Sequence, residues 1–556
     1  MDLYLWRIAE MKISARHGVR NFDDASSFTM RRFLRLIETV GNRLPDPATL
    51  FAIGTVLVLV VSHLAVVGDW RVVEMRPAEV GAGAAEWVAT GEEHRANSLL
   101  TSDGLFWALK NMRKHFIEFP PLGVVLIAMF GVGVAERTGF IAALLKLSLA
   151  RLPARLLTPA TVFVGIMSTL TVDAGYIVLP PLAAMAYYAF GRHPLAGIAA
   201  AFAGTSAGFN ANLFITSIDP MLSELSQNGA RVIDPEYTVS PASNWFFAIA
   251  STFVLTLAGW WTTEKIVEPN LNKSRESMPL ATPDASDGDP TTVTPSETRG
   301  VLWALGAGAA FAALLACAIF IPGAPLHGEV GEAVAEAGEN PLMPRWIMVV
   351  VPLLFFALFI PGVAYGIHQK MIRSDKDVAR LFCESIASMA PIIVLAFFAG
   401  QFIFCFQQSG LGRMLAEVGG QWLATVEMPS WALLLVFILF VGAFNLLIGS
   451  MSAKYAIVAP IFIPMFMLVG ISPELTQAAY RIGDSTTNII TPLNAYLIIV
   501  ITFMQRYQPK GGMGTLISMM LPYTFVFTIV WAVMLVLWIA LGIPLGPQGQ
   551  GPLTFP

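Results

Sequence analysis

Apolar residues occur in blocks of about 20, and this pattern constrains the fold more than any other feature of the chain. Twenty helical residues, at about 1.5 Å of rise each, cross a hydrocarbon core about 30 Å thick. Only 13% of the 556 residues are charged, whereas a soluble domain keeps about a quarter of its residues charged. The remaining charge is too little to coat a water-exposed surface. The sequence therefore predicts an all-α polytopic membrane protein.

Nine blocks are predicted to be transmembrane helices. They lie near 48–68, 119–143, 195–220, 243–265, 300–322, 345–366, 383–410, 474–503 and 515–543. Two other blocks, 156–190 and 430–470, are too long for one crossing, and small polar residues interrupt them at 168–175 and 449–454. We interpret each as a re-entrant helical hairpin. Non-helical backbone at that depth must be covered by protein or line a water-filled cavity.

The charges of the loops support this count. Basic residues collect in short cytoplasmic loops. With the N-terminus inside, the basic segments 145–155 and 368–380 are cytoplasmic, whereas the acidic segments 69–103 and 323–340 lie outside. This bias would fail if either hairpin were a full crossing. We expect a protein of the bacterial inner membrane with a cytoplasmic N-terminus and a periplasmic C-terminus.

The spans divide the chain into two halves, 48–265 and 300–543. Residues 1–47 precede the first half and lack the apolar core of a cleaved signal peptide, so they are expected to form a cytoplasmic amphipathic leader. Residues 266–299 are rich in Pro, Ser, Thr and Asp, which predicts a flexible cytoplasmic linker with either a regulatory role or none. Residues 544–556 are expected to form a periplasmic tail.

The two halves are related by an internal repeat. An offset of 279 residues aligns Tyr176 with Tyr455, Pro181 with Pro460, Pro194 with Pro473, Gly204 with Gly483 and Ser206 with Ser485. The same offset superposes the hairpin tips and the polar interruptions of the broken helices 195–220 and 474–503. Because the first hairpin opens from the cytoplasm and the second from outside, the repeat is inverted, as in secondary transporters. Such a repeat predicts a substrate site near the bilayer midplane.

Two ionisable residues are the main candidates for this site. An ionised aspartate facing lipid costs about 2.5–3.5 kcal/mol, so Asp173 in the first hairpin tip should bind a proton or Na⁺, or cap the tip. Arg481 carries a planar fork suited to a carboxylate or sulfonyl group. It is expected either to clamp an anionic substrate or to pair with Asp484 or Asp173.

Neutral polar residues surround these charges in the sequence. The candidates for substrate contact or coupling are Asp173, Arg481, Tyr455, Pro473, Asn210, Asn212, Asp484, Ser485 and Asn488. The candidates for a Na⁺ site are Asp173, Thr205, Asn210, Ser452 and Asn488. Asp484 could instead pair with Lys454, and Tyr455 could either stack on an aromatic substrate or pack in the core.

The tips and breaks resemble those of the p-aminobenzoyl-glutamate transporter (AbgT) family. The matching stretches are STLTVDAGYIVLPPLAA (168–184), GTSAGFNANLFITSIDP (204–220), GSMSAKYAIVAPIFIPMF (449–466) and SPELTQAAYRIGDSTTNIITPLNAY (472–496). The resemblance implies a homodimeric, bowl-shaped transporter that moves p-aminobenzoyl-glutamate or related aromatic anions, with sulfonamide export in some members. Asp173, Arg481 and Pro473 then match site residues of the family, whereas Tyr455 stands where characterised members carry tryptophan.

We therefore expect alternating access driven by a Na⁺ or H⁺ gradient, with a small aromatic anion and the lipid bilayer as partners. A sodium-coupled dicarboxylate symporter on the same repeat plan is the alternative. An intramembrane hydrolase is a remote one, because the sequence contains no GxSxG, HExxH or Walker A motif. No enzyme activity and no cofactor besides the coupling ion are expected. The net charge of −4 argues against a nucleic-acid partner.

Overall fold

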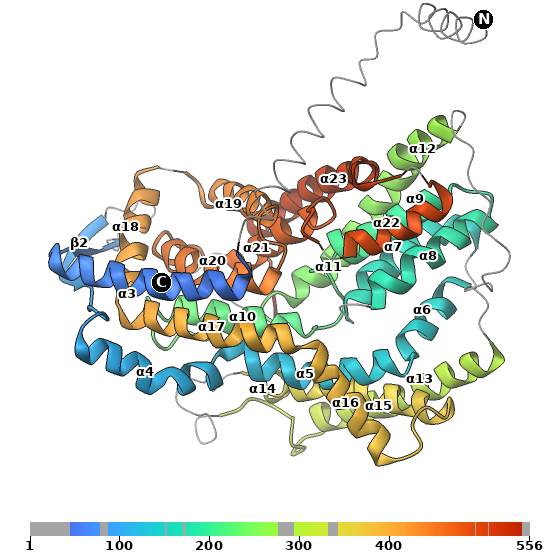
Figure 1. The fold of residues 1–556 in the computed structure, drawn as a ribbon, viewed down its shortest axis with the longest axis horizontal. Coiled ribbons are helices and arrows are strands. Elements are labelled where there is room, and N and C mark those ends of the chain that lie inside the picture. Colours follow the sequence, from blue (N-terminus) through green and yellow to red (C-terminus); the bar gives the residue numbers. More distant parts are fainter. Residues whose placement is uncertain are drawn as a thin grey trace, which may run out of the picture.

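A computed structural model describes residues 45–77, 87–150, 153–170, 174–275, 294–331, 343–426, 428–494, 496–509 and 511–547. These residues are almost entirely helical (Figure 1). The all-α polytopic fold that the sequence predicts is confirmed. Most of the leader, the middle of the linker, Asp173 and the end of the C-terminal tail lie outside the described residues.

Eight helices within the described residues are long and apolar enough to cross a membrane. Seven of them contain the seven unbroken spans that the sequence predicts. These spans are α3 (Pro47–Val67), α5 (Pro120–Arg137), α11 (Trp245–Thr262), α13 (Pro295–Phe320), α15 (Val350–His368), α17 (Ala390–Gln408) and α23 (Met513–Ala540). The eighth is α20 (Met451–Leu468), which belongs to the second hairpin.

Helix-capping chemistry sets several of these boundaries. The carboxylate of Asp46 accepts a hydrogen bond from the backbone N–H of Ala48, and Pro47 occupies the first position of α3. Thr294 and Glu297 form a reciprocal capping box at the start of α13. Both arrangements satisfy N–H groups that a helix leaves unpaired at its first turn.

Two predicted spans differ from the observed helices. The span predicted at 119–143 ends at Arg137, because Gly139 adopts a left-handed φ of +79° and a new helix, α6 (Phe140–Ala150), follows it. The span predicted at 383–410 begins only at Ala390. The residues before it form the separate amphipathic helix α16 (Asp375–Ser388).

The predicted linker is shorter than expected. Helix α11 continues through the π-helix η4 (Thr263–Val267) into α12 (Glu268–Arg275), and α13 already begins at Pro295. Both ends of the segment 266–299 are therefore helical.

Several short elements in the loops were not predicted. Strands β1 (Arg71–Pro77) and β2 (Trp87–Arg95) form an antiparallel pair that packs against α18 (Leu411–Thr425). The other short helices are α4 (Ser102–Ile117), the 3₁₀ turn η1 (Ala154–Leu156) and α14 (Arg345–Met348).

Both re-entrant hairpins are present as pairs of short helices. The first consists of α7 (Leu157–Met167), the 3₁₀ turn η2 (Ser168–Leu170) and α8 (Ala174–Ala189). The second consists of α19 (Ser430–Asn445) and α20. Ser450 caps α20 through a hydrogen bond from the backbone N–H of Ala453.

Both broken helices unwind within their predicted spans, but helical residues continue into the polar interruptions predicted at 204–212 and 483–491. In the first half, α9 (Pro194–Phe202) and the π-helix η3 (Ala203–Ala207) lead into non-helical residues 208–217, which are followed by α10 (Ile218–Ala230). In the second half, α21 (Pro473–Thr487) leads into non-helical residues 488–494, and α22 (Tyr496–Tyr507) follows.

The hairpins and broken helices interlock in the interior of the protein. Helix α10 of the first half packs against α20 and α21, and α22 of the second half packs against α8 and α9. An outer set of helices borders this core, with α15 against α5 and α13, and α17 against α3 and α4 (Figure 1). All residues of the two breaks except Phe214 are thereby buried or half-buried, as non-helical backbone at membrane depth requires.

Candidate functional site

The two halves make the same close backbone contact at equivalent positions. Gly204 and Gly483 are 279 residues apart. A Cβ atom added to Gly204 would lie 2.5 Å from the carbonyl oxygen of Val162, and one added to Gly483 would lie 2.5 Å from that of Ile438. Both carbonyls belong to the first arm of a hairpin. Each broken helix therefore crosses its own hairpin at a glycine, because any larger residue would overlap with the backbone.

The second arm of each hairpin reaches into the opposite half. The ring of Tyr176 in α8 stacks on that of Tyr496 in α22, with centroids 4.0 Å apart. The hydroxyl of Tyr455 in α20 lies 2.6 Å from Ser226 Oγ in α10. Tyr176 and Tyr455 are equivalent in the repeat, and both contact the helix that follows the break of the other half. The inverted repeat is thus visible in side-chain contacts as well as in the sequence.

Polar side chains also connect the two breaks directly. Asn210 Nδ2 donates a hydrogen bond to Ser485 Oγ at 2.6 Å and to the carbonyl of Arg481 at 3.3 Å. In the opposite direction, Asn494 Nδ2 donates to Ser206 Oγ at 3.4 Å. The structure therefore brings the predicted site residues Asn210, Arg481 and Ser485 together, although Asn210 lies more than 270 positions before the other two in the sequence.

Arg481 forms an ion pair that the sequence reasoning missed. Its Nη2 atom lies 2.6 Å from Asp219 Oδ1, and both side chains are largely buried. The predicted partners were Asp484 and Asp173, but Asp484 pairs elsewhere and Asp173 is outside the described residues. Asp219 also accepts hydrogen bonds from the backbone N–H and the hydroxyl of Thr216. The sequence did contain a signal for Asp219. It is an aspartate in an apolar span, and an ionised aspartate there costs the same free energy that made Asp173 a candidate.

Several buried polar atoms near Arg481 have no hydrogen-bond partner among the described residues. They include Nε of Arg481, Oδ1 of Asn210 and Nε2 of Gln477, which lies one turn before Arg481 on α21. An unsatisfied buried polar group costs about 1–3 kcal/mol. Such a group normally bonds to protein, water or a ligand. This cluster of unsatisfied atoms is therefore the best candidate for a substrate contact.

Tyr455 packs inside the protein rather than lining an open surface. Its side chain is fully buried, and its ring centroid lies 4.3 Å from that of Tyr480. Ser226 Oγ, which contacts the Tyr455 hydroxyl, donates to Gln477 Oε1 at 2.9 Å. Of the two roles left open by the sequence, the structure shows core packing. The hydroxyl connects Tyr455 to the polar cluster through Gln477.

Pro473 has a structural position at the start of α21. It follows the N-cap Ser472 and is buried. Arg481 lies eight residues further along this helix, or about 12 Å at 1.5 Å per residue. The proline therefore sets where the helix begins, and any role in transport stays a prediction.

Lys454 and Asp484 form the second buried ion pair. Lys454 Nζ lies 2.5 Å from Asp484 Oδ1, and neither side chain is exposed. The ammonium also donates a hydrogen bond to Asn445 Oδ1. The sequence left mutual pairing and substrate contact open for these residues, and the structure shows the pairing. Asn445 was not identified from the sequence.

The remaining Na⁺ candidates are divided between the two tips. Thr205 Oγ1 donates to the carbonyl of Ala201 at 3.1 Å within the first broken helix. Ser452 Oγ lies 3.3 Å from Ser450 Oγ in the second hairpin, and Asn488 Oδ1 accepts from Asn445 at 2.9 Å. Their role in binding a cation stays a prediction.

Asn212 and Thr491 are equivalent in the repeat, and each bonds to the hairpin of its own half. Asn212 Nδ2 donates to Thr169 Oγ1 at 3.2 Å in the first half. Thr491, which is 279 positions after Asn212, donates to the carbonyl of Asn445 at 3.3 Å. Asn212 therefore connects the first break to its own hairpin, and substrate contact by this residue stays a prediction.

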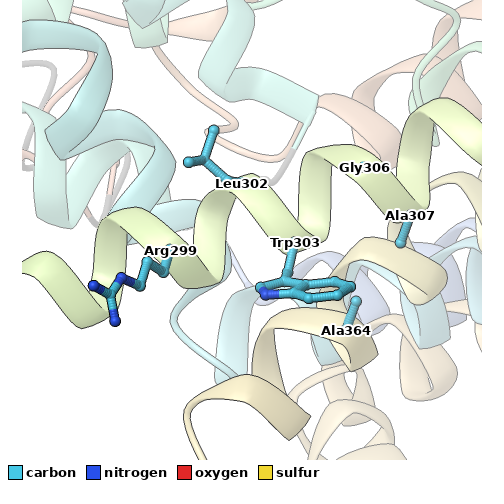
Figure 2. A pocket seen from close by; sticks show the side chains of 6 residues that line it. All are labelled: Arg299, Leu302, Trp303, Gly306, Ala307 and Ala364. Carbon is cyan, nitrogen blue, oxygen red and sulfur yellow. The ribbon is translucent and has the colours of Figure 1, made fainter.

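Two other features lie away from the tips. A surface cavity of about 510 Å³ runs along α13, where Trp303 points toward Ala364 of α15 and Leu302 points away from it (Figure 2). A possible group of metal ligands is formed by Glu74, His94 and Glu417, whose ligand atoms lie within 4.8 Å of one another. It occurs where β1 and β2 pack near α18, outside the polar core.

Comparisons with known proteins agree with this architecture. A model of the AbgT putative transporter family matches residues 32–553. The p-aminobenzoyl-glutamate transport protein of Escherichia coli is 33% identical over 512 residues, which cover 92% of this chain and 95% of that protein.

Two solved transporter structures are similar over almost their whole length. The YdaH transporter of Alcanivorax borkumensis is 40% identical, with a TM-score of 0.81 over 90% of this chain and 100% of that chain. MtrF of Neisseria gonorrhoeae, described as illuminating a class of antimetabolite efflux pumps, is also 40% identical, with a TM-score of 0.80 over 93% of this chain and 99% of that chain. The chain therefore belongs to the AbgT family and is a multi-span membrane transporter, not an enzyme.

Proposed function

We propose that this protein transports p-aminobenzoyl-glutamate and related aromatic carboxylates across the bacterial inner membrane by alternating access, driven by an ion gradient. The identity to a p-aminobenzoyl-glutamate transport protein supports this substrate class. The inverted repeat, whose two breaks are joined by hydrogen bonds from Asn210 and Asn494, supports the mechanism, because such repeats bind substrate between the two halves.

The observation that carries the proposal is the state of Arg481. It is buried beside Asp219 of the other half, and although its Nη2 atom pairs with that aspartate, its Nε atom makes no hydrogen bond to the described residues. A substrate carboxylate offers two oxygens that match the fork of a guanidinium. We infer that the substrate carboxylate binds Arg481, either beside Asp219 or in its place. Exchange between these partners would change the contact that joins the two halves.

The coupling ion is proposed to act at Asp173 in the first hairpin tip. Protonation or Na⁺ binding would remove one negative charge from the cavity that holds the anionic substrate. The charge of the site would then decide which state of the transporter is favoured. Thr205 and Asn210 supply further oxygens for this Na⁺ in the first half.

Export of sulfonamide antimetabolites is proposed as a second activity. The 40% identity to MtrF, which is described with antimetabolite efflux pumps, supports export. A sulfonyl group also offers two acceptor oxygens to an arginine fork. Transport of both compounds would place the carboxylate or the sulfonyl group at the same residue.

The proposed assembly is a homodimer with a cytoplasmic N-terminus and a periplasmic C-terminus. The apolar outer helices support an assembly of this kind. Only 6% of the most apolar 18-residue stretch of α13 is buried within one chain. Such a surface must face lipid or another protein. Mass measurement in lipid nanodiscs tests the dimer, and reporter fusions within residues 276–293 test the orientation.

Flux through proteoliposomes tests the transport proposal. Labelled p-aminobenzoyl-glutamate should accumulate or leave under an imposed pH or Na⁺ gradient. Arg481→Ala should reduce this flux by at least about tenfold, since a hydrogen bond to a charged group contributes about 1.5–3 kcal/mol. The matched control is Arg299→Ala at an exposed position on α13. Equal flux in the two variants would refute the role of Arg481.

Two further measurements test the coupling role of Asp173 and the alternative of a dicarboxylate symporter. Asp173→Asn should leave flux down the substrate gradient but abolish its response to the driving ion. A response as large as that of the wild type would remove Asp173 from coupling. Succinate or citrate should not compete, and competition by these dicarboxylates without competition by aminobenzoates would instead favour a sodium-coupled dicarboxylate symporter.

A further inference from the structure

Lys454 is an unusual residue for its position. It lies in the first turn of α20, where the positive end of the helix dipole disfavours a cation. Its side chain is fully buried with Asp484. Removing two charges from water costs several kcal/mol per ion unless the geometry is excellent. The helix dipole therefore does not stabilise a lysine at this position. The oxygen atoms around the ammonium must stabilise its charge.

Two oxygen atoms contact the ammonium, and a network of hydrogen bonds holds them in place. The Asn445 amide donates to the carbonyl of Asp484 at 2.8 Å, to Thr487 Oγ1 at 2.8 Å and to Asn488 Oδ1 at 2.9 Å. With its nitrogen held in this way, Asn445 directs Oδ1 at Lys454. Asp484 Oδ1 approaches the ammonium from α21, and Asp484 Oδ2 accepts from Asn488 at 3.4 Å.

The donor set has the chemistry of a cation site. A carboxylate oxygen and an amide oxygen converge on one positive charge, at the junction of a hairpin tip and a broken helix. These are the elements that hold Na⁺ or H⁺ in inverted-repeat transporters. The ammonium occupies the place where such an ion would bind.

The first half lacks a tethered cation at the equivalent position. The 279-residue offset places Gly175 opposite Lys454 and Thr205 opposite Asp484. A Cβ atom added to Gly175 would clash with Ser168 Oγ and would lie 3.3 Å from Thr205 Cγ2. A larger residue at this position would require Ser168 to move, and hydroxyl-bearing residues border it where the second half has a charged pair.

We propose that Lys454 is a built-in cation that permanently fills a monovalent-cation site of the second half. The site consists of the Oδ1 atoms of Asp484 and Asn445. An external ion then has a place only in the first half, so each chain binds at most one coupling Na⁺. That this Na⁺ drives transport rests on the proposed function, whereas the cation site itself does not.

Binding of Na⁺ to purified protein tests the proposal without any substrate. Radiolabelled Na⁺ binding is measured at equilibrium, together with the thermal midpoint in NaCl or choline chloride of equal ionic strength. Lys454→Ala should bind one more Na⁺ per chain than the wild type. Its midpoint should also rise more in NaCl than that of the wild type.

Three variants serve as controls. Lys454→Met fills the same space without a charge, so it should gain no Na⁺ binding. Lys454→Ala combined with Asp484→Asn should lose the gained site, because the carboxylate is gone. Lys110→Ala, at an exposed position on α4, should behave as the wild type.

Several results would overturn the proposal. One is a folded, monodisperse Lys454→Ala protein with the Na⁺ stoichiometry of the wild type. Another is an equal gain of Na⁺ binding in Lys454→Met. If Lys454→Ala does not fold, the wild-type stoichiometry still decides, since two Na⁺ ions per wild-type chain would contradict a permanently filled second site. Loss of substrate flux alone would bear only on the proposed function.

Discussion

Arg481 Nη2 of the second half lies 2.6 Å from Asp219 Oδ1 of the first half, so a buried ion pair joins the two halves at the polar core. The pair connects α21 with the start of α10, two residues after the first unwound segment. A substrate that binds Arg481 must compete with this contact or share it. The relationship explains how one arginine can serve both substrate binding and the arrangement of the two halves.

Asp219→Asn should destabilise the protein and strengthen its dependence on substrate. Removing one partner of a buried ion pair costs about 3 kcal/mol, because the other charge stays buried. A substrate carboxylate can replace the lost charge. Added p-aminobenzoyl-glutamate should therefore raise the thermal midpoint more in the variant than in the wild type.

The control for this prediction is Asp375→Asn, at an exposed position in the first turn of α16. It should leave the stabilisation by substrate unchanged. Equal stabilisation of the wild type and Asp219→Asn by the substrate would show that Asp219 and the substrate do not share Arg481.

Arg481→Lys separates charge from geometry. A lysine keeps the positive charge for Asp219, so the free energy of unfolding should change by no more than about 1 kcal/mol. The ammonium lacks the planar fork that binds a carboxylate through two parallel hydrogen bonds. Flux should therefore fall by about tenfold or more. Wild-type flux in a stable Arg481→Lys protein would mean that only the charge matters.

Gly204→Ala and Gly483→Ala should each destabilise the protein by about 2 kcal/mol or more. In both cases the new methyl group would meet a carbonyl oxygen of the hairpin at 2.5 Å, and overpacking of this kind costs about 1–3 kcal/mol. Gly306→Ala on α13 is the matched control, because a Cβ there meets no atom within 4 Å. Similar losses for the two core glycines would support their equivalence. A neutral effect at either one would contradict the tight crossing described above.

Tyr455→Phe should affect stability more than substrate recognition. The ring is fully buried, and removal of the hydroxyl takes away a contact with Ser226 at 2.6 Å. The loss is expected to be about 1 kcal/mol, with a KM within about twofold of the wild type. Tyr188→Phe at an exposed position provides the control. A large change in KM without a loss of stability would favour direct stacking on the substrate.

The expectation of two hairpins and two broken helices followed from the sequence because their signal is local. A crossing needs about 20 apolar residues, and the interruptions at 168–175 and 449–454 stand out against such blocks. The repeat offset alone aligns Gly204 with Gly483. Span ends were less certain, because the left-handed Gly139 and the separate helix α16 depend on single turns.

Side-chain partners depended on the tertiary structure. Arg481 could be selected from its cost in lipid, but its partner Asp219 lies 262 positions away in the sequence. Two other contacts likewise arise only when separate elements pack together. They are the hydrogen bond from Lys454 to Asn445 and the contact of Tyr455 with Ser226. The sequence by itself thus determined which segments lie in the membrane and which charged residues need compensation, since both follow from the cost of exposing groups to lipid. Only the tertiary structure decided which groups provide that compensation, because hydrogen bonds and ion pairs require distances that no linear pattern contains.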